Sequence, residues 1–299
     1  MPASHAEFRP HTIRQERSDG TTKIRQLMIP SDDTRHEHRD MLRLLYGLDI
    51  DMPHATGALP GKTLLDNVRP HRDNNSFYMV DMKNAFPSVD KPHLESIVQS
   101  TVIPKRHRPQ VLDFVQNWAT HPDIPGLPLV APASPYLFNL YCLPMDRRIA
   151  RYCRGQIAYT RYLDDVTFSA PDKLSANRRR SLLGLIQSHP GMVVNHAKSR
   201  LHSLARGPVT ITGVSLYPDR HLGASPGLLQ TAHETFTGVE TMLAEGVAIT
   251  DEDIGRLHGY HGAIHQLSDG ETPTLRRLSA EYLAALSIVG VAPRQDTLF

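Results

Sequence analysis

The sequence predicts an α+β fold in which an antiparallel sheet carries helices on one face. A buried strand pattern at 77–80 ends in Asp81, and two strand patterns at 156–161 and 166–170 flank Tyr162-Leu163-Asp164-Asp165. Aromatic and β-branched residues favour a pleated surface in all three. Helical patterns occupy most of the chain between and after these strands. The order of strand, helices, hairpin, helix and strand indicates a sheet of βαββ type.

The remaining elements follow from apolar periodicity and from turn residues. The stretch 9–30 is polar and basic and ends in Thr21 to Pro30, whose second half alternates well enough for a strand that Pro30 stops. Asp32 or Asp33 could cap a helix that runs through 39–46. Five prolines within 122–135 predict an irregular loop. Further helices are expected at 64–71, 92–103, 108–118, 136–152, 174–188 and within 226–290, and further strands at 192–194 and 209–216.

Composition indicates an ordinary globular protein. The 299 residues are 40% hydrophobic and 21% charged, which is enough to bury a substantial core. No apolar run approaches the ~20 residues that span a bilayer, and the N-terminus has no signal-peptide pattern. We therefore expect a cytoplasmic protein without a membrane partner. Cys142 and Cys153 show no metal-ligand spacing and are expected to be buried and apolar in role.

Charge is distributed unevenly along the chain. Residues 1–222 hold 29 Lys and Arg against 21 Asp and Glu, a net charge of +8, whereas residues 223–299 hold 4 against 10, a net charge of −6. The first three quarters of the chain could therefore contact phosphates. The acidic remainder is expected to form a separate helical subdomain.

The adjacent carboxylates of Asp164 and Asp165 are expected at the tip of a hairpin. An isolated Asp-Asp pair is more often a solvated turn or a helix cap. Like charges held close together raise each other's pKa, however, and a divalent cation relieves the repulsion. Oxygen ligands select Mg²⁺, with Mn²⁺ as the alternative.

Asp81 adds a third carboxylate to this pair, because a strand end can meet the tip of a neighbouring hairpin although Asp81 and Asp164 are 83 positions apart. Three carboxylates from two adjacent strands suit a two-metal site for in-line nucleotidyl transfer. Asp81 and Asp164 are the expected principal ligands of two Mg²⁺ ions, with Asp165 supporting them.

Four motifs in order make the chain resemble a reverse transcriptase. Tyr162-Leu163-Asp164-Asp165 is similar to the YxDD signature of that family, and Val80 to Val89 resembles its first palm motif. Arg25-Gln26-Leu27-Met28-Ile29-Pro30 resembles its fingers motif, and Asn195-His196-Ala197-Lys198 resembles a later palm motif. The resemblance makes Phe86 the steric gate against a 2′-hydroxyl, Arg25 a triphosphate contact and Lys198 a neighbour of the nucleotide.

The resemblance implies a right-hand polymerase that makes DNA on an RNA template from dNTPs. Its fingers would span 1–75, its antiparallel-sheet palm 76–222 with a helical insertion at about 91–125, and its small helical thumb 223–299. Arg17 and Lys23 are possible further contacts of the fingers.

Two further elements resemble the retron subgroup. Asn67-Val68-Arg69-Pro70-His71 is similar to its NAxxH element, and Thr212-Gly213 lies where its VTG element is expected. By this resemblance Asn67, His71, Thr212 and Gly213 are candidate RNA contacts, although a local structural hydrogen bond is the alternative for the first two. The subgroup implies a structured noncoding RNA that serves as template and primer, an RNA–DNA hybrid product, an effector protein and a role in phage defence.

One departure from the family pattern keeps other functions open. Leu129 and Val130 replace Gln and Gly in the loop that resembles LPQGxPxSP, where glycine lets the backbone approach the template. One alternative is a weakly active, RNA-binding module that restrains an effector. Another is a reverse transcriptase of a defence-associated or intron-related kind. An RNA-templated RNA polymerase is disfavoured, because Phe86 should exclude ribonucleotides.

Two other clusters stand out without a clear motif. His258, His261 and His265 are spaced along one helix and are expected to lie against a nucleic-acid backbone or in solvent rather than to bind a metal. Arg178, Arg179 and Arg180 are expected to form a solvated helix face.

Overall fold

The computed structural model describes residues 6–16, 22–121 and 123–293. It contains two compact units. Unit 1 combines Met1–Lys62 with Tyr78–Leu201, and unit 2 combines Thr63–Phe77 with His202–Phe299. These units cut across the expected boundaries of fingers, palm and thumb, and that functional subdivision stays a prediction.

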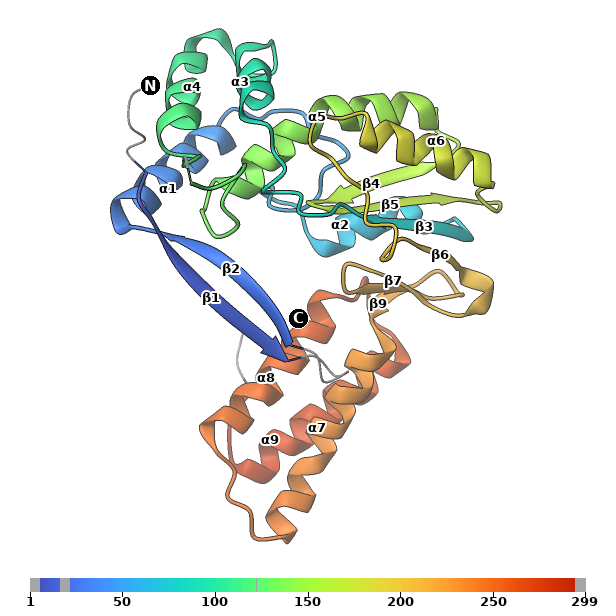
Figure 1. Cartoon of the computed structure of the whole chain (residues 1–299). Coiled ribbons are helices and arrows are strands. Elements are labelled where there is room, and N and C mark those ends of the chain that lie inside the picture. The colour runs from blue at the N-terminus through green and yellow to red at the C-terminus, as the bar shows by residue number, and fades with distance from the viewer. Residues whose placement is uncertain (1–5, 17–21, 122, 294–299) are drawn as a thin grey trace. The chain divides into compact units, whose positions relative to one another are not determined.

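A four-stranded sheet in the order β4-β5-β3-β6 positions the acidic residues of unit 1 (Figure 1). Its strands are β3 Ser76–Asp81, β4 Ala158–Tyr162, β5 Asp165–Ala170 and β6 Arg200–Ser203. β4 and β5 pair as an antiparallel hairpin, with Tyr162 opposite Asp165. The predicted strand before Asp81 and the predicted hairpin are confirmed. The strand expected at 192–194 is wrong, because only Val194 makes an isolated bridge, to Met82.

Helix α5, Ser134–Cys153, forms the centre of the hydrophobic core of unit 1. Its residues 136–143 are all buried, as expected of a mainly apolar helix that is surrounded by other elements. α5 and α6, Ala176–Gln187, lie on one face of the sheet (Figure 1). The other helices of this part, close to their predicted places, are α3 Lys91–Gln99 and α4 Arg108–Asn117.

Both cysteines are buried and unbridged, as predicted. Burial raises the pKa of Cys142 to about 12 and that of Cys153 to about 11. Thiols with so high a pKa are inert at neutral pH, so both act as small core residues.

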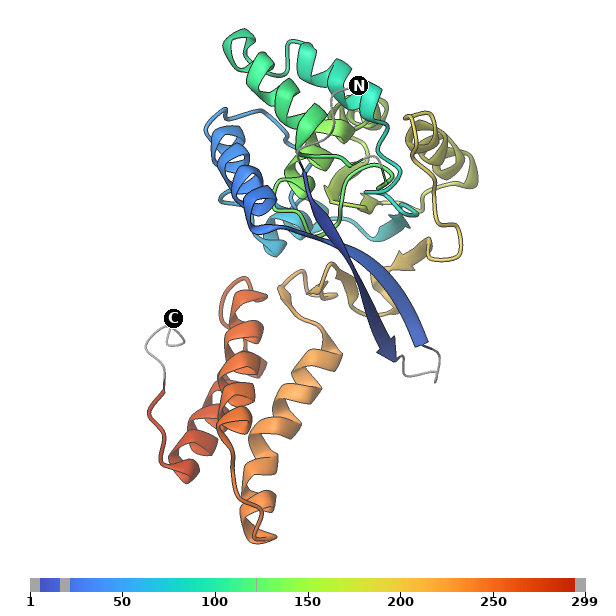
Figure 2. The same cartoon turned by 60° about the vertical axis from the view of Figure 1, so that its left-hand side comes forward.

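Unit 1 begins with a long antiparallel ribbon of β1 Phe8–Glu16 and β2 Thr22–Pro30 (Figure 2). The sequence predicts β2 but not β1. α1, Asp32–Tyr46, follows, and its N-cap is Ser31, whose Oγ accepts a hydrogen bond from the Thr34 amide. The expectation of an aspartate cap is therefore wrong. The two aspartates instead occupy the first turn, where they complement the helix dipole.

Unit 2 contains a small three-stranded antiparallel sheet, one short helix and a group of three longer helices (Figure 2). Its elements are α2 Leu64–Val68, β7 Val209–Ile211, β8 Val214–Leu216, β9 Leu222–Ala224, α7 Pro226–Ala244, α8 Asp251–Gln266 and α9 Pro273–Val289. The single strand expected at 209–216 is instead the hairpin β7–β8, which turns at Thr212 and Gly213. Both turn residues have positive φ, 46° and 93°, as a two-residue hairpin turn of type I′ requires.

The histidines of α8 lie inside the three-helix part of unit 2. His258 Nδ1 is 2.7 Å from the Tyr282 hydroxyl, and the ring of His261 stacks on Tyr282 at 3.9 Å between ring centres. His265 Nε2 is 2.9 Å from Ser279 Oγ. The expectation that these histidines face nucleic acid or solvent is wrong for His258 and His261, which are buried against α9.

No helix among the described residues is long and apolar enough to cross a bilayer.

Candidate active site

Three carboxylates meet where β3 ends and β5 begins. Asp81 is the last residue of β3, Asp164 lies in the β4–β5 turn, and Asp165 is the first residue of β5. The Met82 amide donates a hydrogen bond of 3.0 Å to the Asp164 carbonyl, which joins the two strand ends. The structure therefore places the acidic pair at a hairpin tip beside Asp81, as the sequence predicts.

The carboxylates carry more negative charge than their surroundings neutralise. Burial, followed by the charges of Asp164 and Asp81, raises the pKa of Asp165 to about 6. Burial, with a further increase from Asp81, also raises the pKa of Asp164. The ammonium of Lys198 lowers both but does not cancel the increase. This excess of negative charge is what a bound cation would relieve.

Asp81 is held by the turn that contains Asn195 and Lys198. Lys198 Nζ lies 2.9 Å from Asp81 Oδ2, and Asn195 Nδ2 donates to Asp81 Oδ1 at 2.8 Å. The Asn195 amide also donates to the Asp81 carbonyl at 2.8 Å. Lys198 is exposed, so a cation from solvent can displace its ammonium from Asp81. The predicted nucleotide-side lysine thus lies at the acidic site itself.

The chemistry of these donors fits a hard divalent cation. The available ligands are carboxylate oxygens, and burial together with the neighbouring carboxylates raises the pKa of Asp164 and of Asp165. In the part of the chain that the structure describes, no three His, Cys, Asp or Glu side chains form a ready-made ligand set. Both oxygens of Asp81 already have cationic or amide partners, so a cation at Asp81 would compete with Lys198.

The predicted gate residue, Phe86, packs against the core. Its side chain is 6% exposed and stacks on Phe138 with 4.8 Å between ring centres. Its carbonyl accepts a hydrogen bond of 2.9 Å from the Leu127 amide. The preceding Gly126 has φ of 62°, and a Cβ there would lie 2.3 Å from the Phe86 carbonyl oxygen. Only glycine permits this approach.

The departure from the family pattern lies in the same loop. Leu129 is 48% exposed and Val130 is 38% exposed, so neither side chain fills the core. They follow the segment Gly126-Leu127 that contacts Phe86. The loop therefore presents an apolar surface in place of the expected polar Gln and small Gly.

Arg25 lies in β2, where its backbone pairs with that of Ile13. The side chains of Arg25 and Lys23 fall outside the part that the structure describes, and so does the whole of Arg17. Their predicted roles as contacts of the fingers stay predictions.

The retron-like residues lie together in unit 2. Asn67 Nδ2 donates a hydrogen bond of 3.0 Å to Thr212 Oγ1, so the two motifs are in direct contact. Asn67 and His71 are buried, and burial lowers the pKa of His71 to about 3, which keeps it neutral. Gly213, at the tip of the hairpin, is exposed.

Ion pairs also fasten 63–77 within unit 2. Asp269, which follows α8, pairs with Arg72 and, at 3.3 Å, with Arg69. The motif around Asn67 is therefore fixed against both the β7–β8 hairpin and the helical part of this unit.

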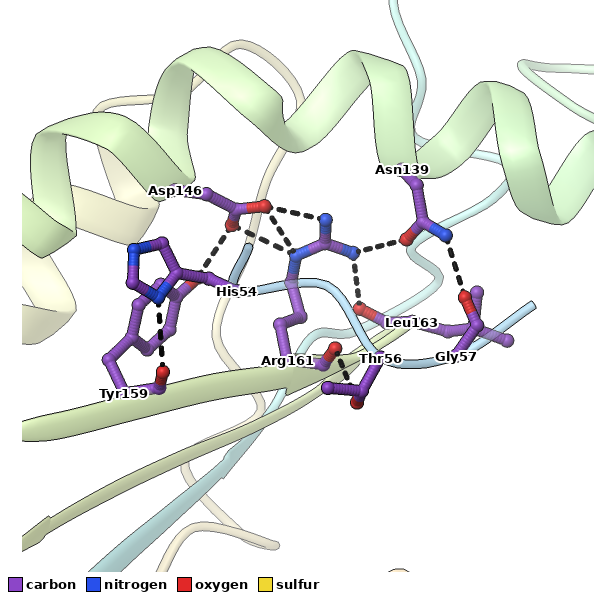
Figure 3. A network of polar contacts seen from close by, with 8 residues as sticks. All are labelled: His54, Thr56, Gly57, Asn139, Asp146, Tyr159, Arg161 and Leu163. Carbon is purple, nitrogen blue, oxygen red and sulfur yellow. Dashed lines mark hydrogen bonds and ion pairs between the residues drawn. The ribbon is translucent and has the colours of Figure 1, made fainter. Parts of the chain in front are cut away.

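Sequence reasoning missed the buried network behind the turn that carries Asp164 (Figure 3). Arg161 of β4 is completely buried and pairs with Asp146 of α5, with 2.7 Å between Nη2 and Oδ2. The Tyr159 hydroxyl also donates to Asp146, at 2.6 Å. The remaining nitrogen, Nη1, donates to Asn139 Oδ1 and to the Leu163 carbonyl, both at 3.0 Å. The signal in the sequence was a charged residue at an inward position of an apolar strand.

This network supports the turn that carries Asp164. Leu163 has φ of 54°, a left-handed conformation that is unfavourable for a leucine. The bond from Arg161 to its carbonyl stabilises this conformation. On the other side, Gly57 lies so close that a Cβ there would be 3.2 Å from the Leu163 amide nitrogen, and its carbonyl accepts a hydrogen bond from Asn139 (Figure 3).

Comparison with known proteins identifies relatives in sequence. Residues 14–239 match the family model "Reverse transcriptase (RNA-dependent DNA polymerase)". The chain is 30% identical over 209 residues to the retron Mx65 reverse transcriptase of Myxococcus xanthus, covering 64% of this chain and 48% of the relative. It is 27% identical over 217 residues to the retron Ec86 reverse transcriptase of Escherichia coli, covering 72% and 65%. The chain thus spans about half to two thirds of the length of these relatives.

Solved structures confirm the fold. Telomerase from Candida tropicalis aligns with 96% of this chain and 59% of its own, at a TM-score of 0.55 and 11% identity. The RNA-dependent RNA polymerase of a human picorbirnavirus aligns with 94% of this chain and 56% of its own, at a TM-score of 0.57 and 9% identity. These likenesses confirm the predicted α+β right-hand polymerase architecture. On the family match and its retron relatives, the chain belongs to the reverse transcriptase family, in its prokaryotic, retron-type branch.

Proposed function

We propose that this chain synthesises DNA on an RNA template from dNTPs. The observation that supports this most directly is the meeting of Asp81, Asp164 and Asp165 at two strand ends with unneutralised negative charge. Membership of the reverse transcriptase family indicates that the cluster would catalyse nucleotidyl transfer.

Asp81 and Asp164 would be the principal ligands of two divalent cations, Mg²⁺ or Mn²⁺, with Asp165 supporting them. When bound, such ions lower the pKa of the primer hydroxyl and neutralise the charge of the triphosphate. Lys198 occupies Asp81 before a cation does and thereby limits the repulsion among the carboxylates. Arg161 and Asn139 hold the turn so that Asp164 needs little reorganisation on binding.

Phe86 would select deoxyribonucleotides, and Arg25 would contact the triphosphate. The stacking of Phe86 on Phe138 fixes its ring, as a gate requires. Phe86→Ala should allow ribonucleotide incorporation to rise by about tenfold or more, since it removes the obstructing ring. Single-nucleotide incorporation with dNTP and rNTP measures this ratio, and an unchanged ratio would exclude Phe86 as the gate. Because Phe86 is buried, the melting temperature of the variant is needed as a control.

The retron relatives suggest the identity of the template. We propose a structured noncoding RNA that primes synthesis from a 2′-hydroxyl, yields a branched RNA–DNA molecule and acts with an effector protein in phage defence. The exposed turn at Gly213 would contact this RNA, while Asn67 and His71, both buried, would fix the turn from behind. A cytoplasmic location remains the expectation.

Extension of an annealed DNA primer on an RNA template with dNTPs and Mg²⁺ tests the central proposal. Incorporation of labelled dNTPs that stops when the metal is chelated supports it, and no incorporation by folded protein contradicts it. Sequencing of co-purifying nucleic acid tests the retron assignment. A branched RNA–DNA species supports that assignment, whereas linear cDNA alone favours a defence-associated reverse transcriptase of another kind.

The exposed Leu129 and Val130 favour one rival function, an RNA-binding module with weak turnover that restrains an effector. Restoring the family pattern with Leu129→Gln and Val130→Gly distinguishes this module from an active polymerase. A large gain in extension rate by this variant from an almost inactive parent supports the module. Ready extension by the parent contradicts it.

A further inference from the structure

Arginines without acidic partners gather where α5 ends and α6 begins, both within unit 1. Residues 147–157 contain four arginines and no acidic residue, and the first turns of α6 add three more. The seven are Arg147, Arg148, Arg151, Arg154, Arg178, Arg179 and Arg180. None of them forms an ion pair with any residue that the structure describes.

Several arginines on other helices do have acidic partners. Arg35 and Arg43 of α1 and Arg256 of α8 each pair with an acidic residue three or four positions away. Such pairing is the usual arrangement on a solvated helix face. Single arginines without an ion pair also occur elsewhere, as at Arg39 of α1, but seven of them in two short segments without acidic partners distinguish this surface from an ordinary charged face.

Three of these arginines line one pocket. Arg151, Arg154 and Arg178 surround a space of about 490 Å³, together with Tyr152 and Gln156. No acidic residue lines it. The turn that follows α5 builds its rim, because Arg154 and Gly155 both have positive φ, 46° and 73°. Arg147 lies one helical turn before Arg151 and extends the same face of α5.

The side chains that surround this pocket suit the phosphates of a nucleic acid. Guanidinium groups bind phosphate oxygens through two parallel hydrogen bonds, and three such groups converge here. Tyr152 is 40% exposed beside them and offers a ring on which an unpaired base can stack. A protein partner would have to supply several carboxylates at matching places, whereas a nucleic-acid backbone presents phosphates at regular intervals.

The pocket is separated from the carboxylate site along β4. Gln156 and Arg154 precede β4, and Asp164 follows it. Five strand residues at about 3.3 Å each put roughly 15 Å between the two ends. A phosphate bound in the pocket is therefore not the triphosphate of the incoming nucleotide.

We propose that this arginine pocket binds the phosphate backbone of an RNA segment that is not being copied. The proposal rests on the proposed function, because an enzyme that copies one part of a structured RNA must hold the rest. The pocket would add affinity for the RNA and leave the rate of nucleotide addition unchanged. Removing an arginine that binds a phosphate should make the affinity for RNA fall less steeply as the salt concentration rises.

The test compares two triple variants with the same loss of charge. One is Arg151→Gln, Arg154→Gln and Arg178→Gln, and the control is Arg35→Gln, Arg43→Gln and Arg256→Gln, which removes ion-paired arginines. Three probes are used: a short primer–template, the same primer–template with an RNA stem-loop attached to the template, and its analogue with a DNA stem-loop. Binding is measured by fluorescence anisotropy over a range of salt concentrations, and extension is measured on the short primer–template.

The pocket variant should bind the RNA stem-loop probe about tenfold more weakly than the parent. Its slope of log affinity against log salt should be less steep by about two, since each phosphate contact contributes roughly 0.7 to 0.9. Affinity for the short primer–template, its extension rate and the melting temperature should not change. Unchanged binding of the stem-loop probe, or an equal loss of affinity in the control variant, would overturn the proposal.

Two further measurements, with the DNA stem-loop probe and with the parent protein alone, distinguish the proposal from related explanations. An equal loss of affinity for the DNA stem-loop shows that the pocket takes either backbone and overturns the assignment to RNA. Failure of the parent protein to extend the short primer–template would contradict the proposed function, while the binding comparison would still decide the role of the pocket.

Discussion

Two charged clusters lie within a few residues of each other in unit 1, and their charges are arranged in opposite ways. At Arg161 and Asp146 one positive and one negative group are completely buried, and Tyr159 and Asn139 complete the hydrogen bonds of the pair. At the strand ends three carboxylates share one exposed ammonium. The first cluster is neutral as a whole, and the second is not.

The difference separates a structural role from a chemical one. A buried, balanced ion pair adds little net stability, since desolvation offsets its attraction, but removing one partner is costly. Such a pair fixes geometry. An unbalanced cluster that is partly buried but open to solvent costs stability and can bind a cation. The two are coupled here, because Arg161 also holds the carbonyl of Leu163 beside Asp164.

The largest expected effect follows from neutralising the unbalanced cluster. Asp164→Asn with Asp165→Asn should reduce primer extension by about a thousandfold or more, since the cation ligands are removed. The free energy of unfolding should not fall, because like charges no longer repel. Extension assays and chemical denaturation in metal-free buffer measure the two quantities. Full extension by the double variant would contradict the assignment of the site.

Breaking the balanced cluster should instead lower stability. Arg161→Met leaves Asp146 buried without its counter-charge and should reduce the free energy of unfolding by about 3–5 kcal/mol. Arg161→Met with Asp146→Asn keeps an acceptor for the Tyr159 hydroxyl and should recover much of that stability. Extension should stay low in both, because the Leu163 carbonyl no longer has its donor. Normal extension by the more stable double variant would show that Arg161 does not position the turn.

Removing the ammonium of Lys198 should increase the net negative charge of the carboxylate cluster. Lys198→Gln should strengthen Mn²⁺ binding in the absence of nucleic acid severalfold, because Lys198 no longer competes for Asp81. Extension should fall at the same time if Lys198 also contacts the nucleotide. Titration calorimetry and extension rates are compared with Lys91→Gln, because the ammonium of Lys91 donates to the Gln116 carbonyl and pairs with no carboxylate of the described residues. Weaker metal binding in Lys198→Gln would contradict the competition.

The smallest effect is a pH dependence of stability. The pKa of Asp165 is raised to about 6 in the folded state, above the usual value near 3.9, so the folded protein holds this proton more tightly than the unfolded chain. Stability is therefore lost as pH rises from about 4 to about 6. In metal-free buffer at pH 7, Asp165→Asn should be more stable than the parent by on the order of 1 kcal/mol, an amount reduced by solvent screening. This advantage should disappear below pH 4, and an advantage that persists there would contradict the stated cause.

The acidic site was predictable because its chemistry is local to strand ends. Asp81 ends an apolar strand, and Asp164 and Asp165 separate two strand patterns, so topology alone brings them together. Arg161 was not predicted, because its partners Asp146 and Asn139 lie 15 and 22 residues away and show no pattern of their own.

The sequence analysis did not predict β1 or the turn between β7 and β8, and both omissions have a physical reason. β1 pairs only with β2 in a ribbon, and its exposed residues leave no alternating pattern to read. The turn between β7 and β8 was hidden because Thr212, with φ of 46°, is an unusual residue for a left-handed turn position. The hydrogen bond from Asn67 to Thr212 supplies the tertiary support that the local sequence lacks.

Two glycines have a consequence for any substitution at the proposed gate. Gly126 lies against the Phe86 carbonyl, and a Cβ on Gly191 would lie 1.9 Å from the Ser88 carbonyl oxygen. The backbone that carries Phe86 is thus in close contact with two distant parts of the chain. Replacing the ring of Phe86, the proposed gate, should change which nucleotides are accepted, whereas adding a methyl group at either glycine must displace this backbone. Selection for unusual nucleotides should therefore vary position 86 and leave positions 126 and 191 unchanged.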